Sequence, residues 1–317
     1  MASGGLQEQL SSLEPKLARV LLAIADAVAE IAVVLRGSGH SEVGTANAFG
    51  DKQLQADVAA DAVVLERLRQ CGAVETASSE ERPELVPLGG RGYSVAWDPL
   101  DGSSILAAGW AVGAIFGVWP GAQLLGRCGQ EQSAAAYAVF GPRTILVLAR
   151  PLTGAGGGGP RSCTVQEFVL GEPRGAGATW ALARSDVRIG EKQVFAPANL
   201  RAAAEHEPYR RLVDAMVAER YTLRYSGGLV PDIHHILAKG GGVFVNPVLA
   251  SAPAKLRVLY EVLPLAFVVE AAGGASTHDG RGSALRLAAG ACDARSAVAL
   301  GSPLQVDRAC ECMAPVD

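Results

Sequence analysis

The stretch over residues 97–104, Trp-Asp-Pro-Leu-Asp-Gly-Ser-Ser, places two carboxylates three positions apart. The alternating apolar residues just before it, 93–97, predict a strand. Pro99 has a fixed φ angle and no N–H, so it predicts a turn that holds Asp98 and Asp101 close together. Carboxylates a few Å apart repel each other unless they share a proton or bind a cation. The spacing therefore indicates a cation site.

Directly after the second carboxylate, Gly102, Ser103 and Ser104 offer unhindered backbone N–H groups and two hydroxyls, which can cradle an anion. A cation site beside an anion cradle favours a phosphate ester held on a hard metal ion. Taken alone, however, the stretch is explained better by an Asx-type turn that leads into a helix N-cap.

Further acids lie near the ends of separate predicted elements. In the helix predicted over 52–70, Asp61 falls inside the apolar stripe and Asp57 at its edge, so both need a cation or hydrogen-bond donors. Oxygen-only ligands suit Mg²⁺ or Mn²⁺, whereas zinc would require His or Cys. The acids considered together are Asp51, Asp57, Glu80, Glu81, Asp98, Asp101 and Glu261.

Sequence spacing alone cannot assemble these acids. Taken singly, Glu80 and Glu81 fit a solvated loop, and Glu261 in an apolar helix fits a core acid paired with Arg or Lys.

Periodicity and turn residues predict short strands alternating with helices, which indicates stacked α/β layers. Helices are predicted over 13–35, 52–70, 131–140, 231–239 and 255–272, with another beginning at Asn199; strands are predicted over 74–81, 93–97, 112–119, 144–149, 221–226, 243–245 and 297–300. The glycine-rich loop 153–160 is either a domain linker or, preferably, the end of a hairpin. We expect an N-terminal metal-binding domain over 1–180 and a C-terminal substrate domain over 181–317.

Composition indicates an ordinary globular protein. With 317 residues, 49% hydrophobic and 19% charged, and a net charge of −4, the chain has neither the basic surface of a nucleic-acid binder nor an apolar run that could span a membrane. Its six cysteines contain no Cys-x-x-Cys pair, which fits reduced thiols. The opening residues resemble no targeting segment, so we expect a cytoplasmic protein.

From about residue 49 to 302, the chain resembles the sugar bisphosphatases of the lithium-sensitive, magnesium-dependent phosphatase superfamily, whose signature is Asp-Pro-Leu-Asp-Gly-Ser-Ser. The resemblance implies a layered α-β-α-β-α sandwich, Mg²⁺ as cofactor with Mn²⁺ as a substitute, and a homodimer or larger homo-oligomer. It implies a small-molecule sugar bisphosphate as partner; on composition we expect neither nucleic acid nor membrane as a partner.

The resemblance also implies roles for individual acids. Asp98, Asp101 and Glu261 would bind one metal ion, and Glu80, Asp98 and the Leu100 carbonyl a second. Asp51 and Glu80 would hold a third where one is present. Glu81 and Asp57 would orient and deprotonate the attacking water, while Gly102 and Ser103 would cradle the phosphate that is cleaved. Ser104, the next residue of the anion cradle, is a further candidate. Asp61 has no family role that we can assign; we interpret it as supporting the metal ligands or as a structural acid paired with donors.

The second half of the chain supplies candidates for the remote phosphate. By resemblance these are Asn199, Arg224, Tyr225 and Lys255, with Arg224 reaching across from a neighbouring subunit. Arg201 and Asn246 are further candidates, because they stand where this chain departs from the fructose bisphosphatases. Without the resemblance, Arg224 and Lys255 would fit ordinary surface ion pairs equally well.

Two departures bear on the sugar. Fructose bisphosphatases usually have a tyrosine at the position of Asn246 and another shortly after Asn199, where this chain has Leu200 and Arg201. Less aromatic bulk and an added cation favour a seven-carbon sugar, as in the sedoheptulose branch. Residues 40–45 contain no cysteine, unlike the plastid enzymes, so we expect no thioredoxin switch.

We therefore predict hydrolysis of the C1 phosphate of sedoheptulose 1,7-bisphosphate. The alternatives are fructose-1,6-bisphosphatase activity, alone or in addition, and, from another class, a non-catalytic phosphosugar-binding protein.

Overall fold

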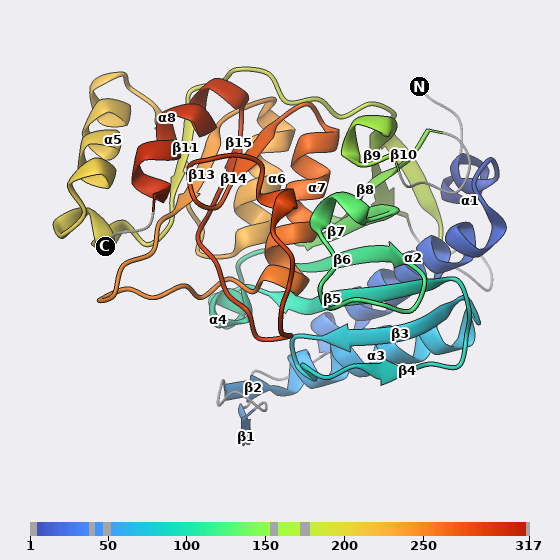
Figure 1. The fold of residues 1–317 in the computed structure, drawn as a ribbon. Coiled ribbons are helices and arrows are strands. Elements are labelled where there is room, and N and C mark those ends of the chain that lie inside the picture. Colours follow the sequence, from blue (N-terminus) through green and yellow to red (C-terminus); the bar gives the residue numbers. More distant parts are fainter. Residues whose placement is uncertain (1–4, 38–41, 47–51, 153–157, 172–177, 315–317) are drawn as a thin grey trace.

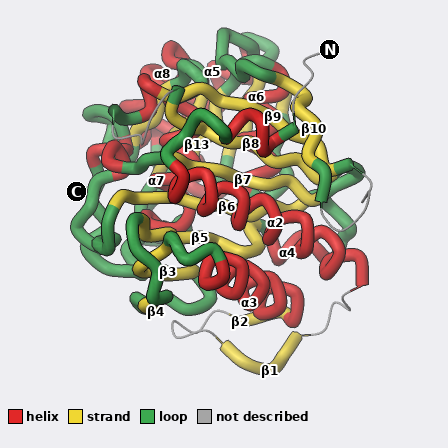
Figure 2. Tube along the Cα trace, turned by 90° about the vertical axis from the view of Figure 1, so that its right-hand side faces the viewer, coloured by secondary structure: helices red, strands yellow, loops and turns green. Residues whose placement is uncertain are grey.

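The structure is a computed structural model that describes residues 5–37, 42–46, 52–152, 158–171 and 178–314. Within these ranges the chain forms two large mixed sheets with helices packed between and outside them (Figure 1, Figure 2). A small separate pair, β1 (Glu42–Ala46) and β2 (Lys52–Leu54), is antiparallel. No helix within the described ranges is long and apolar enough to cross a bilayer.

The larger sheet contains eight strands among the described residues, and only β3 and β5 pair in parallel. In spatial order they are β10 (Trp180–Arg184), β9 (Cys163–Leu170), β8 (Thr144–Pro151), β7 (Ala134–Phe140), β6 (Val112–Pro120), β5 (Tyr93–Asp101), β3 (Val74–Ser79) and β4 (Val86–Pro87). The strand that carries the Asp-Pro-Leu-Asp motif, β5, is thus an interior strand with neighbours on both sides.

The smaller sheet contains five short strands of the described chain. In order they are β12 (Thr222–Leu223), β11 (Val194–Pro197), β13 (Val243–Asn246), β15 (Val298–Gly301) and β14 (Ala275–Thr277). Strand β11 is parallel to both its neighbours, whereas β15 is antiparallel to both of its own.

Helices form the other three layers. Helices α1, α2 and α3 pack on one face of the larger sheet, α6 and α7 fill the space between the sheets, and α5 and α8 cover the outer face of the smaller sheet (Figure 1). Their bounds are α1 (Leu6–Leu10), α2 (Pro15–Gly37), α3 (Gln55–Gln70), α4 (Ser103–Leu106), α5 (Glu207–Ala218), α6 (Leu229–Lys239), α7 (Leu263–Ala271) and α8 (Pro303–Met313). This order confirms the predicted α-β-α-β-α layering.

The alanine-rich stretch 131–140, predicted to be a helix, is mainly strand β7, so that prediction is wrong. Strand β7 pairs with β6 and β8, and all its residues are buried. Ala136 and Ala138 face the core beneath α2, while Tyr137 and Val139 face the core that contains α7. Ladder hydrogen bonds and burial on both faces outweigh the local helix propensity of alanine.

The predicted hairpin around the glycine-rich loop is confirmed, because β8 and β9 are antiparallel neighbours from Ile145 opposite Val169 to Pro151 opposite Cys163. The middle of its loop, 153–157, lies outside the described residues. The helix predicted over 255–272 begins later, with a π-helical turn (Val258–Val262) that continues into α7. The helix predicted to start at Asn199 is a 3₁₀ turn (Leu200–Ala204) followed by α5.

Candidate active site

A bulge in β5 brings the two motif acids to the same face of the larger sheet. Asp98 lies opposite Ile115 of β6 and Asp101 lies opposite Gly113, so three steps along β5 match two along β6. Because side chains alternate along a strand, residues three apart would otherwise face opposite sides, and one extra residue restores a common side. The turn predicted at Pro99 is therefore a bulge, at which a residue without an N–H is tolerated.

The start of α6 approaches β5 closely enough to bind Asp101. Its two carboxylate oxygens accept hydrogen bonds from the Leu229 N–H (3.1 Å) and the Val230 N–H (2.6 Å). A Cβ atom on Gly113, the cross-strand partner of Asp101, would lie 2.3 Å from the Val230 Cβ. Only glycine at this position allows α6 to come so near, and the helix N-terminus then stabilises the carboxylate.

The third acid comes from the π-helical turn. The N–H groups of Glu261 and Val262 both lie 3.1 Å from the Arg257 carbonyl oxygen, and the Glu261 Oε2 accepts the Arg257 N–H at 2.5 Å. Such local widenings of a helix occur frequently at functional sites. The structure brings Asp98, Asp101 and Glu261 together, with one carboxylate oxygen of each within 4.8 Å of the others. They are only 3, 7 and 6% exposed.

The crowding changes the acidity of these groups. Burial, together with the neighbouring Asp101 and Glu261, raises the pKa of Asp98 well above its ordinary value. Burial raises the pKa of Glu261 to about 8 and that of Asp101 to about 6, although backbone N–H groups donate to both. Three buried carboxylates that each disfavour ionisation form a site that a divalent cation would stabilise, and an all-oxygen donor set suits Mg²⁺ or Mn²⁺.

Two more of the predicted acids surround this cluster. Asp57 is buried in the first turn of α3, and its charge helps raise the pKa of Asp98. Glu80 follows β3; its N–H donates to the Trp97 carbonyl at 3.0 Å, and its carboxylate forms an ion pair with Arg257. Glu80 therefore contacts both β5 and Arg257, which precedes the π-helical turn. It is not a solvated loop residue, the alternative that fits Glu80 when it is taken singly.

Three further residues were predicted to bind metal or to accept a proton: Glu81, Leu100 and Asp51. Glu81 is half-buried, next to Glu80. The Leu100 N–H donates to the Asp98 Oδ1 at 2.9 Å, which fixes the bulge. Asp51 lies outside the described residues.

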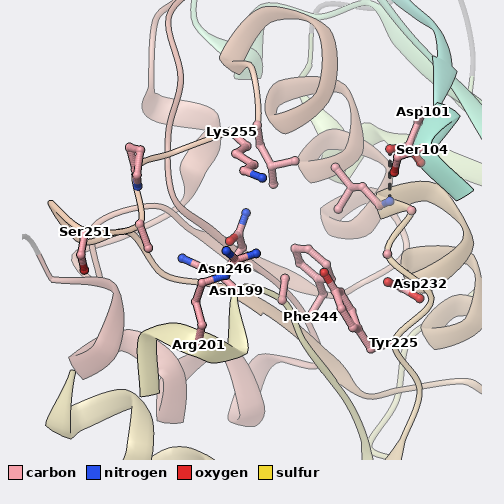
Figure 3. Close-up of a pocket in the computed structure, with 17 residues that line it drawn as sticks. Asp101, Ser104, Asn199, Arg201, Tyr225, Asp232, Phe244, Asn246, Ser251 and Lys255 are labelled. Atoms are coloured by element: carbon pink, nitrogen blue, oxygen red, sulfur yellow. Dashed lines mark hydrogen bonds between the residues drawn. The ribbon is translucent and has the colours of Figure 1, made fainter. Parts of the chain in front are cut away.

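A cavity of about 340 Å³ opens beside the acidic cluster, and Asp101 forms part of its wall. It runs between the larger sheet, α6 and the smaller sheet, and Figure 3 shows its polar side chains converging on one space. Six residues predicted to bind substrate line this cavity: Ser104, Asn199, Arg201, Tyr225, Asn246 and Lys255.

The two cations of the cavity come from distant parts of the chain. Arg201 projects from the 3₁₀ turn and Lys255 from the segment before the π-helical turn, and Figure 3 shows both pointing toward Asn199 and Asn246. Neither cation has a hydrogen bond or an ion pair with any other described residue. The Asn199 Nδ2 donates to the Pro247 carbonyl at 2.9 Å, and its left-handed backbone (φ 51°) is one that asparagine tolerates.

Three predicted substrate residues do not line the cavity. Arg224 is exposed and its guanidinium donates to the Leu223 carbonyl at 2.7 Å. Gly102 adopts a left-handed conformation (φ 82°) at the end of β5, and a Cβ there would lie 3.2 Å from the Gly228 Cα. Ser103 follows in the first turn of α4. The cradle residues thus border the start of α6 at the rim of the cavity.

Sequence reasoning missed two residues of this site. Arg257 is buried and pairs with Glu80; a basic residue four positions before Glu261 was the available signal. Asp232 lines the cavity, is buried, and its Oδ1 accepts the Ser226 N–H at 2.7 Å. Burial raises its pKa to about 6, and no spacing rule distinguished it from an acid in the first turn of an ordinary helix.

Two family models match most of the chain. The family model described as "Fructose-1-6-bisphosphatase, N-terminal domain" matches residues 4–170, and that of the C-terminal domain matches 189–314. The chain is 42% identical to the chloroplastic sedoheptulose-1,7-bisphosphatase of Chlamydomonas reinhardtii over 93% of this chain and 73% of that protein. It is 38% identical to the class 1 fructose-1,6-bisphosphatase of Syntrophotalea carbinolica, over 83% of this chain and 78% of that one.

A crystal structure from Toxoplasma gondii, provisionally named as a sedoheptulose-1,7 bisphosphatase, is also similar. It has a TM-score of 0.85 and 36% sequence identity, and the match covers 98% of both chains.

Proposed function

We propose, because this chain belongs to the fructose-1,6-bisphosphatase family, that it hydrolyses the C1 phosphate of sedoheptulose 1,7-bisphosphate to sedoheptulose 7-phosphate and phosphate. One observation carries the proposal. Asp101 belongs both to the acidic cluster and to the wall of the cavity whose other residues include Arg201 and Lys255. A ligand with two phosphates can therefore place one at the acids and the other at the cations.

Asp98, Asp101 and Glu261 would hold a first divalent cation, Mg²⁺ or Mn²⁺. Glu80 and the Leu100 carbonyl, with Asp98, would hold a second, and Asp51 would contribute to a third. When bound, these ions supply a lowered pKa for water and positive charge beside the leaving oxygen.

The protein's own groups would carry out the proton transfer and positioning. Glu81 and Asp57 accept the proton of the attacking water, for which their places beside Glu80 and Asp98 are suited. Gly102, Ser103 and Ser104 orient the phosphate that is cleaved, so that water attacks in line without a covalent enzyme intermediate.

The cavity would hold the far end of the substrate. Arg201 and Lys255 bind the second phosphate through charge-assisted hydrogen bonds, and Asn199, Tyr225 and Asn246 complete its surroundings. The seven-carbon sugar is favoured by Asn246 and Arg201 in the wall and by the similarity to sedoheptulose bisphosphatases.

Assembly and location are part of the same proposal. Arg224 is exposed and outside the cavity, which fits a role in the active site of a second copy, so we infer a homodimer or larger homo-oligomer. A monomer with full activity in solution would contradict this role.

The free cysteines fit a reducing compartment such as the cytosol. We retain residues 1–180 and 181–317 as the metal-binding and substrate domains.

The test is phosphate release from sedoheptulose 1,7-bisphosphate and fructose 1,6-bisphosphate, measured side by side. We expect a higher kcat/KM for the seven-carbon substrate, loss of turnover with EDTA, and recovery with Mg²⁺. A higher value for the six-carbon substrate would favour the fructose-1,6-bisphosphatase alternative, which the class 1 relatives support. Binding of either sugar without turnover in Mg²⁺ would indicate a non-catalytic phosphosugar-binding protein.

A further inference from the structure

A buried carboxylate outside the acidic cluster ties three elements together. Asp61 of α3 is 2% exposed and accepts hydrogen bonds from the Arg82 Nε at 2.9 Å and the Trp97 Nε1 at 3.0 Å. The nearby Ser79 side chain also opposes the rise that burial causes in the pKa of Asp61. This agrees with the interpretation of Asp61 as an acid paired with donors.

Both donors, like Ser79, lie next to predicted metal or proton-transfer residues in the sequence. Ser79 and Arg82 bracket Glu80 and Glu81, and they bond each other through Ser79 N–H to Arg82 O (3.3 Å) and Arg82 N–H to Ser79 Oγ (3.0 Å). The turn 79–82 is therefore closed on itself and fastened to Asp61.

The other donor to Asp61, Trp97, connects this turn to the cluster. Trp97 directly precedes Asp98, and alternation along β5 turns the indole toward α3 while Asp98 faces the opposite side. The Trp97 carbonyl accepts the Glu80 N–H. On α3, Asp61 lies one turn after Asp57, on the same face of the helix. One carboxylate thus fixes α3, the turn 79–82 and β5 relative to one another.

We propose that Asp61 is a positioning residue that sets the spacing between Asp57 on α3, the Glu80–Glu81 turn and Asp98 on β5. The inference rests on the proposed function, because it assigns these acids to metal binding and proton transfer. A purely structural role would require only that the α3 interface be filled. Two donors, one from each of the two chain segments that carry the acids, provide more than filling, since they restrict where those segments can lie.

The variant Asp61→Asn separates the two roles. Asparagine keeps the shape of aspartate but offers one carbonyl oxygen and an NH₂ group, so it can accept from Arg82 or from Trp97 but presents a donor to the other. Glu270→Gln is the matched control, because Glu270 also accepts from two side chains, the Ser276 and Ser283 hydroxyls at 2.5 Å each, and lies outside the acidic cluster and the cavity.

We would titrate each purified protein with Mn²⁺ by electron paramagnetic resonance and measure kcat, KM and the Mg²⁺ concentration for half-maximal activity. For Asp61→Asn we expect Mn²⁺ affinity to fall about tenfold and kcat by about 10 to 100-fold, with KM within about twofold. Glu270→Gln should change none of these. If both variants lose only thermal stability, the positioning role is wrong.

Two further arms keep the test decisive. If Asp61→Asn does not fold, Trp97→Phe removes one donor while leaving the Asp61–Arg82 pair, and should weaken Mn²⁺ binding by a few fold; unchanged binding would overturn the inference. If the wild-type protein hydrolyses neither bisphosphate, the proposed function fails. The Mn²⁺ titrations of wild type and variants still decide whether Asp61 positions the acids.

Discussion

The acidic cluster and the cationic wall of the cavity are adjacent but are held in different ways. Asp98, Asp101 and Glu261 are buried, and backbone N–H groups from β5, α6 and Arg257, just before the π-helical turn, donate to them. Arg201 and Lys255, in contrast, are exposed and have no hydrogen bond or ion pair within the described chain. The cluster is preorganised and the cations are left available to a ligand, which is the division expected when chemistry occurs at one end of a substrate and recognition at the other.

The largest expected effect tests the cluster alone. Replacing Asp98 by Asn removes a charge from the metal site but leaves the cavity intact, so kcat should fall about 10⁴-fold in saturating Mg²⁺. Calorimetric affinity for the bisphosphate should change much less. Asp214→Asn, an exposed acid on α5, is the control and should be fully active. Equal losses of binding and turnover in Asp98→Asn would show that the two regions are not separable.

The second prediction concerns pH and the metal-free protein. The pKa of Glu261 is about 8 in the folded chain against an ordinary 4.5, so the folded state holds a proton that the unfolded state has released between these values. Stability of the metal-free protein should therefore fall as pH rises from about 5 to 8, by on the order of 3 kcal/mol. Denaturant unfolding in the presence of EDTA, repeated across this pH range, measures the change in the free energy of unfolding.

Controls identify the source of this pH dependence. The loss of stability with rising pH should be smaller in Glu261→Gln, because this variant lacks the titrating group. It should also be smaller in saturating Mg²⁺, because the bound cation stabilises the ionised form of Glu261. A metal-free wild-type protein whose stability is flat or rises over this interval would contradict the electrostatic account of the cluster.

Much of this cluster was accessible from the sequence, for reasons that individual residues make clear. Asp98 and Asp101 are only three positions apart in the chain, so their spacing suggested a shared site that the family signature then favoured over an ordinary turn. The bulge that aligns them was not predicted, because it depends on the pairing of Asp101 with Gly113 on another strand. Glu261 was connected to them only by family resemblance, since its contact with the motif crosses about 160 residues of chain.

The wrong and the missing predictions also arise because tertiary contacts, not local sequence, decide the structure at these positions. Strand β7 was predicted as a helix because alanine favours helices locally, while its two neighbouring strands and the helices on both faces determine its structure. Arg257 was missed because its partner, Glu80, lies far along the chain, and Asp232 because its role depends on burial in the cavity wall. Local patterns identified the acidic motif, but only the tertiary structure shows what surrounds it.

The third prediction tests the cavity alone. Arg201→Leu removes an unpaired cation from its wall, so kcat/KM for sedoheptulose 1,7-bisphosphate should fall about 30-fold, mainly through KM. Arg91→Leu removes an exposed arginine that does not line the cavity and should have no effect. A loss confined to kcat would assign Arg201 to the reacting end of the substrate. It would contradict the assignment of recognition to the cationic wall of the cavity.

The smallest expected effect concerns the choice of sugar. Asn246 is buried at the end of β13 and its side chain lines the cavity, so a tyrosine there would fill part of the 340 Å³ and place a phenol where a shorter bisphosphate could reach it. In Asn246→Tyr, the ratio of kcat/KM for the six-carbon to the seven-carbon substrate should rise about tenfold, a size typical of changes in pocket volume. Asn246→Ala, which removes the amide without filling the space, should lower both values by similar factors. Because Asn246 does not belong to the acidic cluster, Mn²⁺ affinity should be unchanged in both variants. A ratio that stays constant in Asn246→Tyr would place sugar selection elsewhere, with Arg201 as the next residue to exchange.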